Sequence, residues 1–483
     1  MLLKEIFEII SKMNKSEKSF FKRYCKLYSN NLNTRNYLVI YEETYKQVKT
    51  GVFDEERLMK VIKRKIDPKH FSNAKQYLHQ QLLNSLLTYH KNSDPYLKIS
   101  NMIQANIILH KKGLFMMGMR ILGKAKKEAI ATENLPHQLA VIDITSQMIN
   151  MRDPDFHVDL RKEAQLANKQ YDELNEVYIF YNKCVGLFMS EFALHPKDNR
   201  IKELYENDLI NRVSESSTNK AKAYIFCARS ILAMMLGKFE EVIAYEEKVI
   251  NVHKENQLLE ILMVKSHQHI LTAAIQRKDE ATYLAYKTLF LQLELSKYVW
   301  STAFLKKVEL SYCRVFNKRE EGLALVAQLK DQYFAKPLED ITPNESLVTI
   351  YLICFLCQIG EYQATLDWIL FWYDTPYTSL YGKRRLVVKV MELITHIELG
   401  NSLLVPSLNN ALKRDIQKQF EPEAFEKLLF SFFYKMDGSF TDKEQLQAFY
   451  QTTNDNFLAI DLRQHHHFWF QLFDFKQYFQ NKL

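Results

Sequence analysis

Three short stretches of the sequence carry residue types that could do chemistry. The first, Gly118 to Ala125, reads G-M-R-I-L-G-K-A and follows the spacing of a phosphate-binding loop up to its last position. Such a loop needs Ser or Thr after the lysine to hold Mg²⁺, and it must join a strand to a helix so that backbone N–H groups cradle phosphate. Ala125 stands at that position, and apolar residues such as Ile121 and Leu122 give the stretch an amphipathic helical pattern. We therefore expect a helix here and no nucleotide site.

The second stretch is a cysteine pair, Cys354 and Cys357, with the C-x-x-C spacing of zinc and redox sites. Zinc would need a second pair or histidines, and redox chemistry would need a βαβ setting. The surrounding residues instead form an apolar helical pattern that runs to Gly360. We expect buried, reduced thiols.

The third stretch is the histidine run His465, His466 and His467. Consecutive residues on a helix point about 100° apart, so the three rings cannot converge on one ion. A helical zinc site uses the spacing H-E-x-x-H, which does not occur in the chain. We expect no metal site and no cofactor.

Catalytic motifs are also missing from the sequence. There is no G-x-S-x-G elbow, no G-x-G-x-x-G and no calcium loop. Paired acids such as Glu240 and Glu241 are adjacent, which on a helix turns them apart, whereas general acid–base pairs face each other across a substrate. The sequence therefore favours a protein that is not an enzyme.

The composition predicts an all-helical fold. The 483 residues include only 11 Gly and 10 Pro, as expected when few turns separate long helices, and alternating β-branched runs are scarce. Lys4, Glu5 and Glu8 interrupt the apolar residues at the N-terminus, so we expect no signal peptide. No apolar window of about 18 residues predicts a membrane span. The six cysteines are scattered, which suits reduced thiols, and we expect a cytoplasmic location with no membrane partner.

Positive charge is concentrated in the first third of the chain. The whole sequence carries a net charge of +8, with 65 Lys and Arg against 57 Asp and Glu. Residues 1–150 alone hold 25 basic and 13 acidic residues, a net charge of +12, which leaves −4 for the remainder. Any electrostatic attraction to an acidic partner should therefore come from the N-terminal third.

Two basic clusters make a candidate interaction surface in that third. At 100° per residue, one lysine stripe falls opposite an aromatic stripe of Phe20, Phe21, Tyr24 and Tyr28, which should be core. This surface could meet an acidic protein or neutralise nucleic-acid phosphates, or it could be an ordinary solvated face. Its members are Lys15, Lys18, Lys22, Lys26, Lys60, Lys63 and Arg64.

Turn signals recur about every 40 residues from Pro95 onward. The turns inside helical hairpins are expected near Gly113, Asp153, Lys197, Gly237, Arg277, Asn317, Gly360, Gly400 and Gly438. Second breaks are expected near Pro95, Pro136, Asp172, Ser217, Asn256, Ser296, Pro343, Pro376 and Pro422. Two breaks per period predict two helices per repeat.

Two of these turns resemble a known repeat. Gly237-Lys238-Phe239 and Gly360-Glu361-Tyr362 are similar to the Gly-x-Tyr/Phe turn of tetratricopeptide repeats. The period near 40 departs from the 34 residues of that family, and the first-helix Trp-x-x-Leu-Gly signature is absent. The resemblance implies a tetratricopeptide-like superhelix whose turn aromatic packs back on the first helix, and it carries over no peptide-binding positions.

The expected fold is thus an all-α, right-handed superhelix (an α-solenoid) of about nine antiparallel helix hairpins. Residues 1–92 should form a basic helical cap, residues 93–463 the repeats, and residues 464–483 a C-terminal aromatic helix. Phe468, Leu472, Phe475 and Phe479 fall on one face of that helix, which could cover the open end of the stack or serve as a docking surface.

The sequence favours a scaffold that binds a protein or peptide, including an acidic one, on the concave face of the superhelix. Tyr224, Phe226 and Arg229, on the helix before Gly237, are the candidate concave-face contacts. The alternative is a nucleic-acid-associated or regulatory protein that uses the basic N-terminal third. The sequence specifies neither the partner nor the oligomeric state.

Overall fold

In the computed structural model the described residues are mainly helical, and no strand occurs among them. These residues are 2–27, 33–148, 154–190, 198–212, 217–256, 260–293, 295, 298–436, 443–461 and 467–483. The prediction of an all-α fold is confirmed. The chain divides into two compact units, Met1–Tyr171 and Asp172–Leu483.

The first unit begins with five helices that share one core, formed by residues such as Ile6, Phe21, Tyr41, Leu58 and Leu82. They are α1 (Leu2–Lys12), α2 (Lys15–Leu27), α3 (Asn33–Thr50), α4 (Glu55–Lys63) and α5 (Pro68–His90). A separate small core follows, under α6 (Pro95–Lys111), α7 (Phe115–Ala131) and α8 (Leu135–Met148). Helix α9 (Pro154–Ser190) leads into the second unit.

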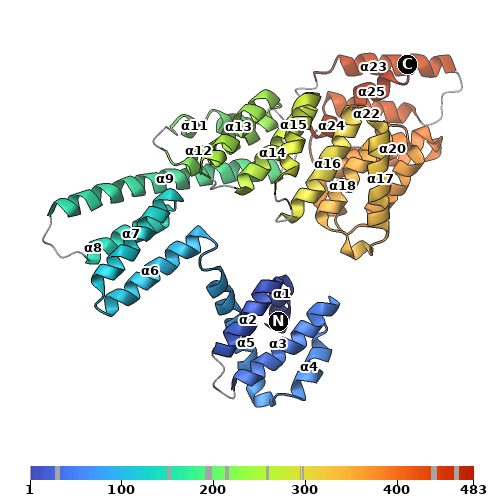
Figure 1. Cartoon of the computed structure of the whole chain (residues 1–483). Coiled ribbons are helices and arrows are strands. Elements are labelled where there is room, and N and C mark those ends of the chain that lie inside the picture. The colour runs from blue at the N-terminus through green and yellow to red at the C-terminus, as the bar shows by residue number, and fades with distance from the viewer. Residues whose placement is uncertain are drawn as a thin grey trace. The chain divides into compact units, whose positions relative to one another are not determined.

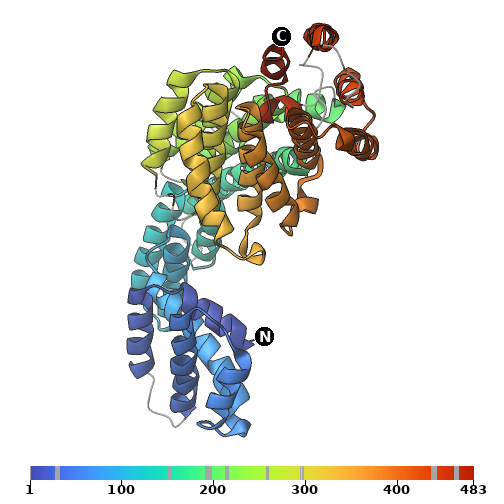
Figure 2. The same cartoon turned by 90° about the vertical axis from the view of Figure 1, so that its right-hand side faces the viewer.

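The second unit is mainly a series of helix pairs, which Figures 1 and 2 show side by side from green to orange. Two short helices come first, α10 (Asn199–Tyr205) and α11 (Leu209–Arg212). The pairs are α12 (Asn219–Met235) with α13 (Phe239–Asn256), α14 (Glu260–Gln276) with α15 (Glu280–Leu291), α16 (Val299–Val315) with α17 (Arg319–Phe334), α18 (Pro343–Gln358) with α19 (Tyr362–Asp374), and α20 (Gly382–Glu398) with α21 (Val405–Gln417). Helices α22 (Ala424–Lys435), α23 (Lys443–Leu458), α24 (His467–Leu472) and α25 (Phe475–Gln480) complete the chain.

The same turn geometry joins the two helices of each pair. In each turn a backbone N–H reaches back five residues to a carbonyl, as from Lys238 to Ala233 at 2.8 Å and from Glu361 to Leu356 at 3.0 Å. This is the Schellman bond, which needs a left-handed residue after the helix. Five pair turns place that residue about 40 apart, with positive φ at Gly237, Lys278, Asn317, Gly360 and Gly400. The predicted polar turns near 277 and 317 therefore form as the glycine turns do. The predicted turns at Asp153, Lys197 and Gly438, and the break at Ser296, lie outside the described residues.

The aromatic residue of the first resembling turn, Phe239, is half-buried and packs against the small core of Ala233, Met234, Val242 and Ala273. Full burial would make Phe→Ala cost about 3–5 kcal/mol, so we expect Phe239→Ala to lower the free energy of unfolding by about 1–2 kcal/mol. Urea unfolding would measure the change. Phe115 follows Gly113 at the same place in its turn but is 54% exposed, so Phe115→Ala should stay within about 0.5 kcal/mol. Equal effects from the two variants would contradict this packing.

The predicted break at Asp172 is wrong. Helix α9 passes through it without interruption, so it joins two segments that the 40-residue period assigned to separate hairpins. The physical reason is local: residues 155–185 contain neither Gly nor Pro, and Asp172 is exposed on the helix surface, where an acidic side chain is tolerated. The predicted second helix of that hairpin is replaced by the short helices α10 and α11.

The single helix predicted for residues 464–483 is also wrong. It divides into α24 and α25, because Asp474 caps α25 by accepting a hydrogen bond from the backbone N–H of Gln477 at 3.0 Å. The signal was in the sequence, since an acidic residue followed three positions later by Gln is typical of a helix start. The aromatic residues Trp469, Phe475 and Phe479 are nevertheless buried, each at most 1% exposed.

Candidate functional site

Two of the three motifs set aside in the sequence, the glycine-containing stretch and the cysteine pair, are confirmed as helical. Gly118 lies inside α7 and packs against Asn106. Cys354 and Cys357 are free, buried thiols of α18, and burial raises the pKa of Cys354 to about 12, which disfavours the thiolate that a ligand or nucleophile needs. His465 and His466 lie outside the described residues. Within the described ranges, no group of three His, Cys, Asp or Glu side chains is placed to hold a metal ion.

One residue of the predicted basic surface, Lys22, has a carboxylate partner in the same unit. Lys15, Lys22 and Lys26 are exposed on α2 and Lys18 is half-buried, while Lys60, Lys63 and Arg64 are exposed at α4. Glu42 pairs with Lys22 at 3.2 Å, and Glu43 accepts from Lys65 at 2.6 Å and from Lys46 at 2.9 Å. The hydrogen bond from Lys65 is the main cause that holds the pKa of Glu43 below its usual range.

Three lysines, two of them from the predicted surface, lie around a tyrosine of α3. The ammonium groups of Lys18, Lys22 and Lys49 lie 5.6, 5.6 and 5.1 Å from the centre of the Tyr45 ring. Cations at this distance are attracted to the face of an aromatic ring. No described contact joins this group to Lys60, Lys63 and Arg64 of the second predicted cluster. Two of the four predicted α2 lysines, Lys18 and Lys22, thus contact α3. The predicted lysines and arginine at α4 are separate from them.

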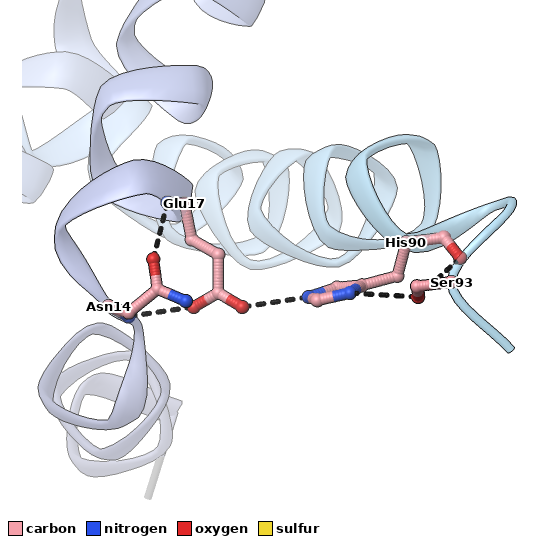
Figure 3. Close-up of polar contacts among 4 residues, drawn as sticks. All are labelled: Asn14, Glu17, His90 and Ser93. Atoms are coloured by element: carbon pink, nitrogen blue, oxygen red, sulfur yellow. Dashed lines mark hydrogen bonds and ion pairs between the residues drawn. The ribbon is translucent and has the colours of Figure 1, made fainter.

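Figure 3 shows a polar chain between the start of α2 and the end of α5. Asn14 and Glu17 form a reciprocal cap: the Asn14 side chain accepts from the Glu17 N–H at 2.9 Å, and the Glu17 carboxylate accepts from the Asn14 N–H at 2.7 Å. The other oxygen of Glu17 lies 2.7 Å from Nε2 of His90, whose Nδ1 lies 3.2 Å from Oγ of Ser93.

This chain has the carboxylate, imidazole and hydroxyl of a hydrolytic triad, but its serine is not bonded as a triad serine is. Ser93 Oγ donates to the backbone carbonyl of His90 at 2.9 Å, so its proton is directed to the main chain and not to the imidazole. A triad serine must give that proton to the histidine. The arrangement instead fastens α2 to α5, and we assign it a structural role.

The predicted contact Arg229 lies in a cluster of cations and tyrosines. Its guanidinium stacks 4.0 Å from the Tyr205 ring centre and donates to the Tyr205 backbone carbonyl at 2.6 Å. The ammonium of Lys238 lies 4.2 Å from the same ring, and the Tyr205 hydroxyl donates to Glu241 at 2.5 Å. A first-helix arginine therefore holds the main chain at the end of α10.

The other two predicted contacts are half-buried on the same helix, α12. Tyr224 meets Tyr178 and Tyr181 of α9 edge to face, at 4.5 and 5.1 Å between ring centres. Phe226 stacks near Tyr245 of α13 at 6.3 Å, and Lys248 lies 5.5 Å from the Phe226 ring. The three predicted residues share one helix, but each already contacts a different neighbour.

The first helices of the pairs, α12, α14, α16, α18 and α20, form a continuous layer in which each helix contacts the next. We call the surface of this layer the first-helix face. The C-terminal segment, residues 467–483, folds back onto the ends of its last three helices. Side chains from those helix ends hold the segment, and they are separated from it by 80 to 157 residues along the chain.

Three of these bonds are made to the main chain of the segment. Arg314 of α16 donates to the carbonyl of Gln471 at 2.8 Å. Gln358 of α18 brackets Asp474: its amide oxygen accepts from the Asp474 N–H at 2.8 Å, and its amide nitrogen donates to the Asp474 carbonyl at 3.3 Å. Glu398 of α20 accepts from the Tyr478 hydroxyl at 2.9 Å. The first-helix face thus binds a peptide segment, which belongs to the protein itself.

A partly buried lysine lies on α16. Lys307 of α16 places its ammonium 5.3 Å from the ring centre of Phe304 and 5.5 Å from that of Tyr351 on α18. Burial, and then the nearby Arg384 of α20, lower the pKa of Lys307 to about 7. Arg384 is itself only 7% exposed. Sequence reasoning missed these cations, because Lys306 and Lys307 together resemble ordinary helix surface.

No described helix has the length and apolar character that crossing a bilayer requires. Comparisons of the chain with protein-family models, with curated proteins and with solved structures find no match.

Proposed function

We propose that this protein is a non-enzymatic, cytoplasmic scaffold, a right-handed α-solenoid of tetratricopeptide-like hairpins, whose first-helix face holds a protein or peptide partner. The observation that carries the proposal is the bracketing of the Asp474 main chain by the side chain of Gln358. A side-chain amide that hydrogen-bonds both the N–H and the C=O of one residue recognises the peptide backbone, and this recognition does not depend on the side chain of the bound residue.

The first-helix face also binds a main-chain group at its α12 end. Arg229 of α12 donates to the carbonyl of Tyr205, as Arg314 of α16 does to that of Gln471. Both are charge-assisted bonds, which are stronger than those between neutral groups. At the basic surface on which the alternative function would depend, Lys22 is already paired with Glu42 at 3.2 Å.

Affinity capture with defined variants would test the proposal. We expect Arg229→Ala combined with Phe226→Ala to reduce about tenfold the yield of each partner that the wild type captures, since aromatic and arginine side chains dominate such surfaces. Asp331→Ala, an exposed position on the second helix α17, should leave the yields unchanged. Circular dichroism would confirm that both variants fold. Equal yields from all three proteins would contradict the placement of the partner on the first-helix face.

A further inference from the structure

The turn between α6 and α7, which lie side by side as a hairpin (Figure 1), presents apolar side chains to solvent. Four consecutive residues after the turn glycine are apolar, and each is at least half exposed: Leu114 50%, Phe115 54%, Met116 73% and Met117 53%. We call these four residues the α6–α7 tip. None of them is a member of the small core under these helices. Soluble proteins rarely leave several large apolar neighbours in water unless they bind something.

The α6–α7 tip also lacks the residues that stabilise comparable helix starts. Helix α7 has no side-chain cap at Leu114 and no acidic residue in its first turn. Helices α13 and α17, which follow equivalent turns of the second unit, begin with the acidic pairs Glu240–Glu241 and Glu320–Glu321. Acidic side chains there interact favourably with the helix dipole, and a side-chain cap stabilises a helix start. Since α7 has neither and its tip residues bury little within the fold, a binding role accounts for them.

The hairpin that carries the tip is basic throughout. Residues 95–127 contain seven Lys and Arg and no Asp or Glu. Two of the seven are paired, Lys98 with Glu128 at 2.9 Å and Lys126 with Glu163 at 2.5 Å. The remaining five are exposed, and no ion pair between described residues involves them. They are Lys111, Lys112, Arg120, Lys124 and Lys127.

These unpaired cations adjoin the tip on both helices. Lys111 and Lys112 end α6 directly before the turn. On α7, Arg120 and Lys124 follow Met116 at steps of four residues, which places all three on one side of the helix. A surface that meets the hairpin end therefore contacts the apolar tip first and the cations behind it.

We propose that the α6–α7 tip inserts into the surface of an anionic lipid bilayer, with Lys111, Lys112 and Arg120 binding the lipid headgroups. An apolar element beside several basic residues is the combination that attaches a protein reversibly to such a surface. No membrane-spanning helix is needed for this contact. It replaces the sequence-based expectation of no membrane partner, which considered only the lysines of α2 and α4 and the lack of a spanning segment.

The shape and chemistry of the tip favour a bilayer over other occupants. Consecutive residues of a helix point about 100° apart, so the four apolar side chains face several directions. A protein groove would cover one side of this turn, whereas a bilayer surface surrounds a protruding element. A nucleic acid would attract the cations but would offer nothing to the apolar side chains.

Sedimentation of the full-length protein with lipid vesicles would test the proposal. We expect the wild type to pellet with vesicles of equal parts phosphatidylserine and phosphatidylcholine, and to remain in solution with phosphatidylcholine alone. Phe115→Ser should weaken the binding about tenfold, because the ring no longer leaves water on insertion. Lys111→Gln combined with Lys112→Gln should weaken it by about as much, since two charges near the anionic surface are lost.

Ile130→Ser is the matched control. Ile130 is 54% exposed, as Phe115 is, but it lies about 22 Å away along the axis of the same helix. It should leave the binding unchanged, and circular dichroism would confirm that all variants fold. Equal weakening by Phe115→Ser and Ile130→Ser, or no pelleting of the wild type with the anionic vesicles, would overturn the proposal. Binding that depends on the lysines and not on Phe115 would also overturn it, and would assign the hairpin to polyanions such as nucleic acid.

Insertion itself can be measured with an environment-sensitive dye. All six native cysteines are buried, so a thiol-reactive dye would label Met116→Cys selectively. Its emission should shift to the blue with the anionic vesicles, and the same dye on Ile130→Cys should not shift. An unshifted emission at position 116 while the protein pellets would contradict insertion of the tip.

Discussion

Replacing Gly322 by alanine is expected to lower the free energy of unfolding by about 2 kcal/mol, although alanine is the better helix former by about 1 kcal/mol. Gly322 lies in α17, where an added Cβ would stand 2.0 Å from Cζ of Phe355 on α18. The Phe355 ring is completely buried, so it cannot swing into solvent to make room. Forcing a methyl group into a close-packed core costs about 1–3 kcal/mol, and this overlap places the cost at the upper end.

Gly186 provides the matched control in the same unit. It also lies inside a helix, α9, but is exposed, and a Cβ added there would meet no atom within 4 Å. Gly186→Ala should therefore raise the free energy of unfolding by about 0.5–1 kcal/mol. Urea unfolding followed by circular dichroism would measure both variants. Stabilisation by Gly322→Ala as well would show that α17 does not approach α18 as described.

The helix pairs could be predicted because their turns depend on neighbouring residues. Gly237, Gly360 and Gly400 adopt positive φ, which glycine does without strain, so their residue type alone indicated the turns. Lys278 and Asn317 adopt the same conformation, and there the surrounding polar residues gave the signal. In each case the hydrogen bonds that close the turn span only five residues, a range that a local pattern can specify.

The candidate site could not be predicted in the same way, because its contacts are distant in sequence. Arg314 and Gln471 are 157 residues apart, and Gln358 and Asp474 are 116 apart. No periodicity relates such pairs. The C-terminal aromatic residues were predicted as one helical face, but the cap at Asp474 turns the chain so that α24 and α25 reach different helices. The cap at a single residue, Asp474, thus determines which helices the C-terminal segment contacts.

Removing Trp469 should have the largest effect in the C-terminal segment. The Trp469 side chain is fully buried, packs 5.8 Å from the ring centre of Phe425, and donates from Nε1 to Glu426 at 2.7 Å. The Glu426 side chain is also fully buried. Trp469→Ala should lower the free energy of unfolding by about 3–5 kcal/mol, because it leaves a cavity and a buried carboxylate oxygen without its donor.

Trp469→Phe separates these two causes. It keeps most of the ring volume and removes only the N–H donor, so it should cost about 1–3 kcal/mol, the range for a buried polar group that loses its partner. Hydrogen exchange would show where the stability is lost: the amides of α24 and α25 should lose protection in both variants, while those of α12 keep it. Loss of protection in α12 equal to that in α24 would mean that the segment is integral to the whole helix layer and does not dock on its last helices. The first-helix face would then have no region that the segment leaves open for a second peptide.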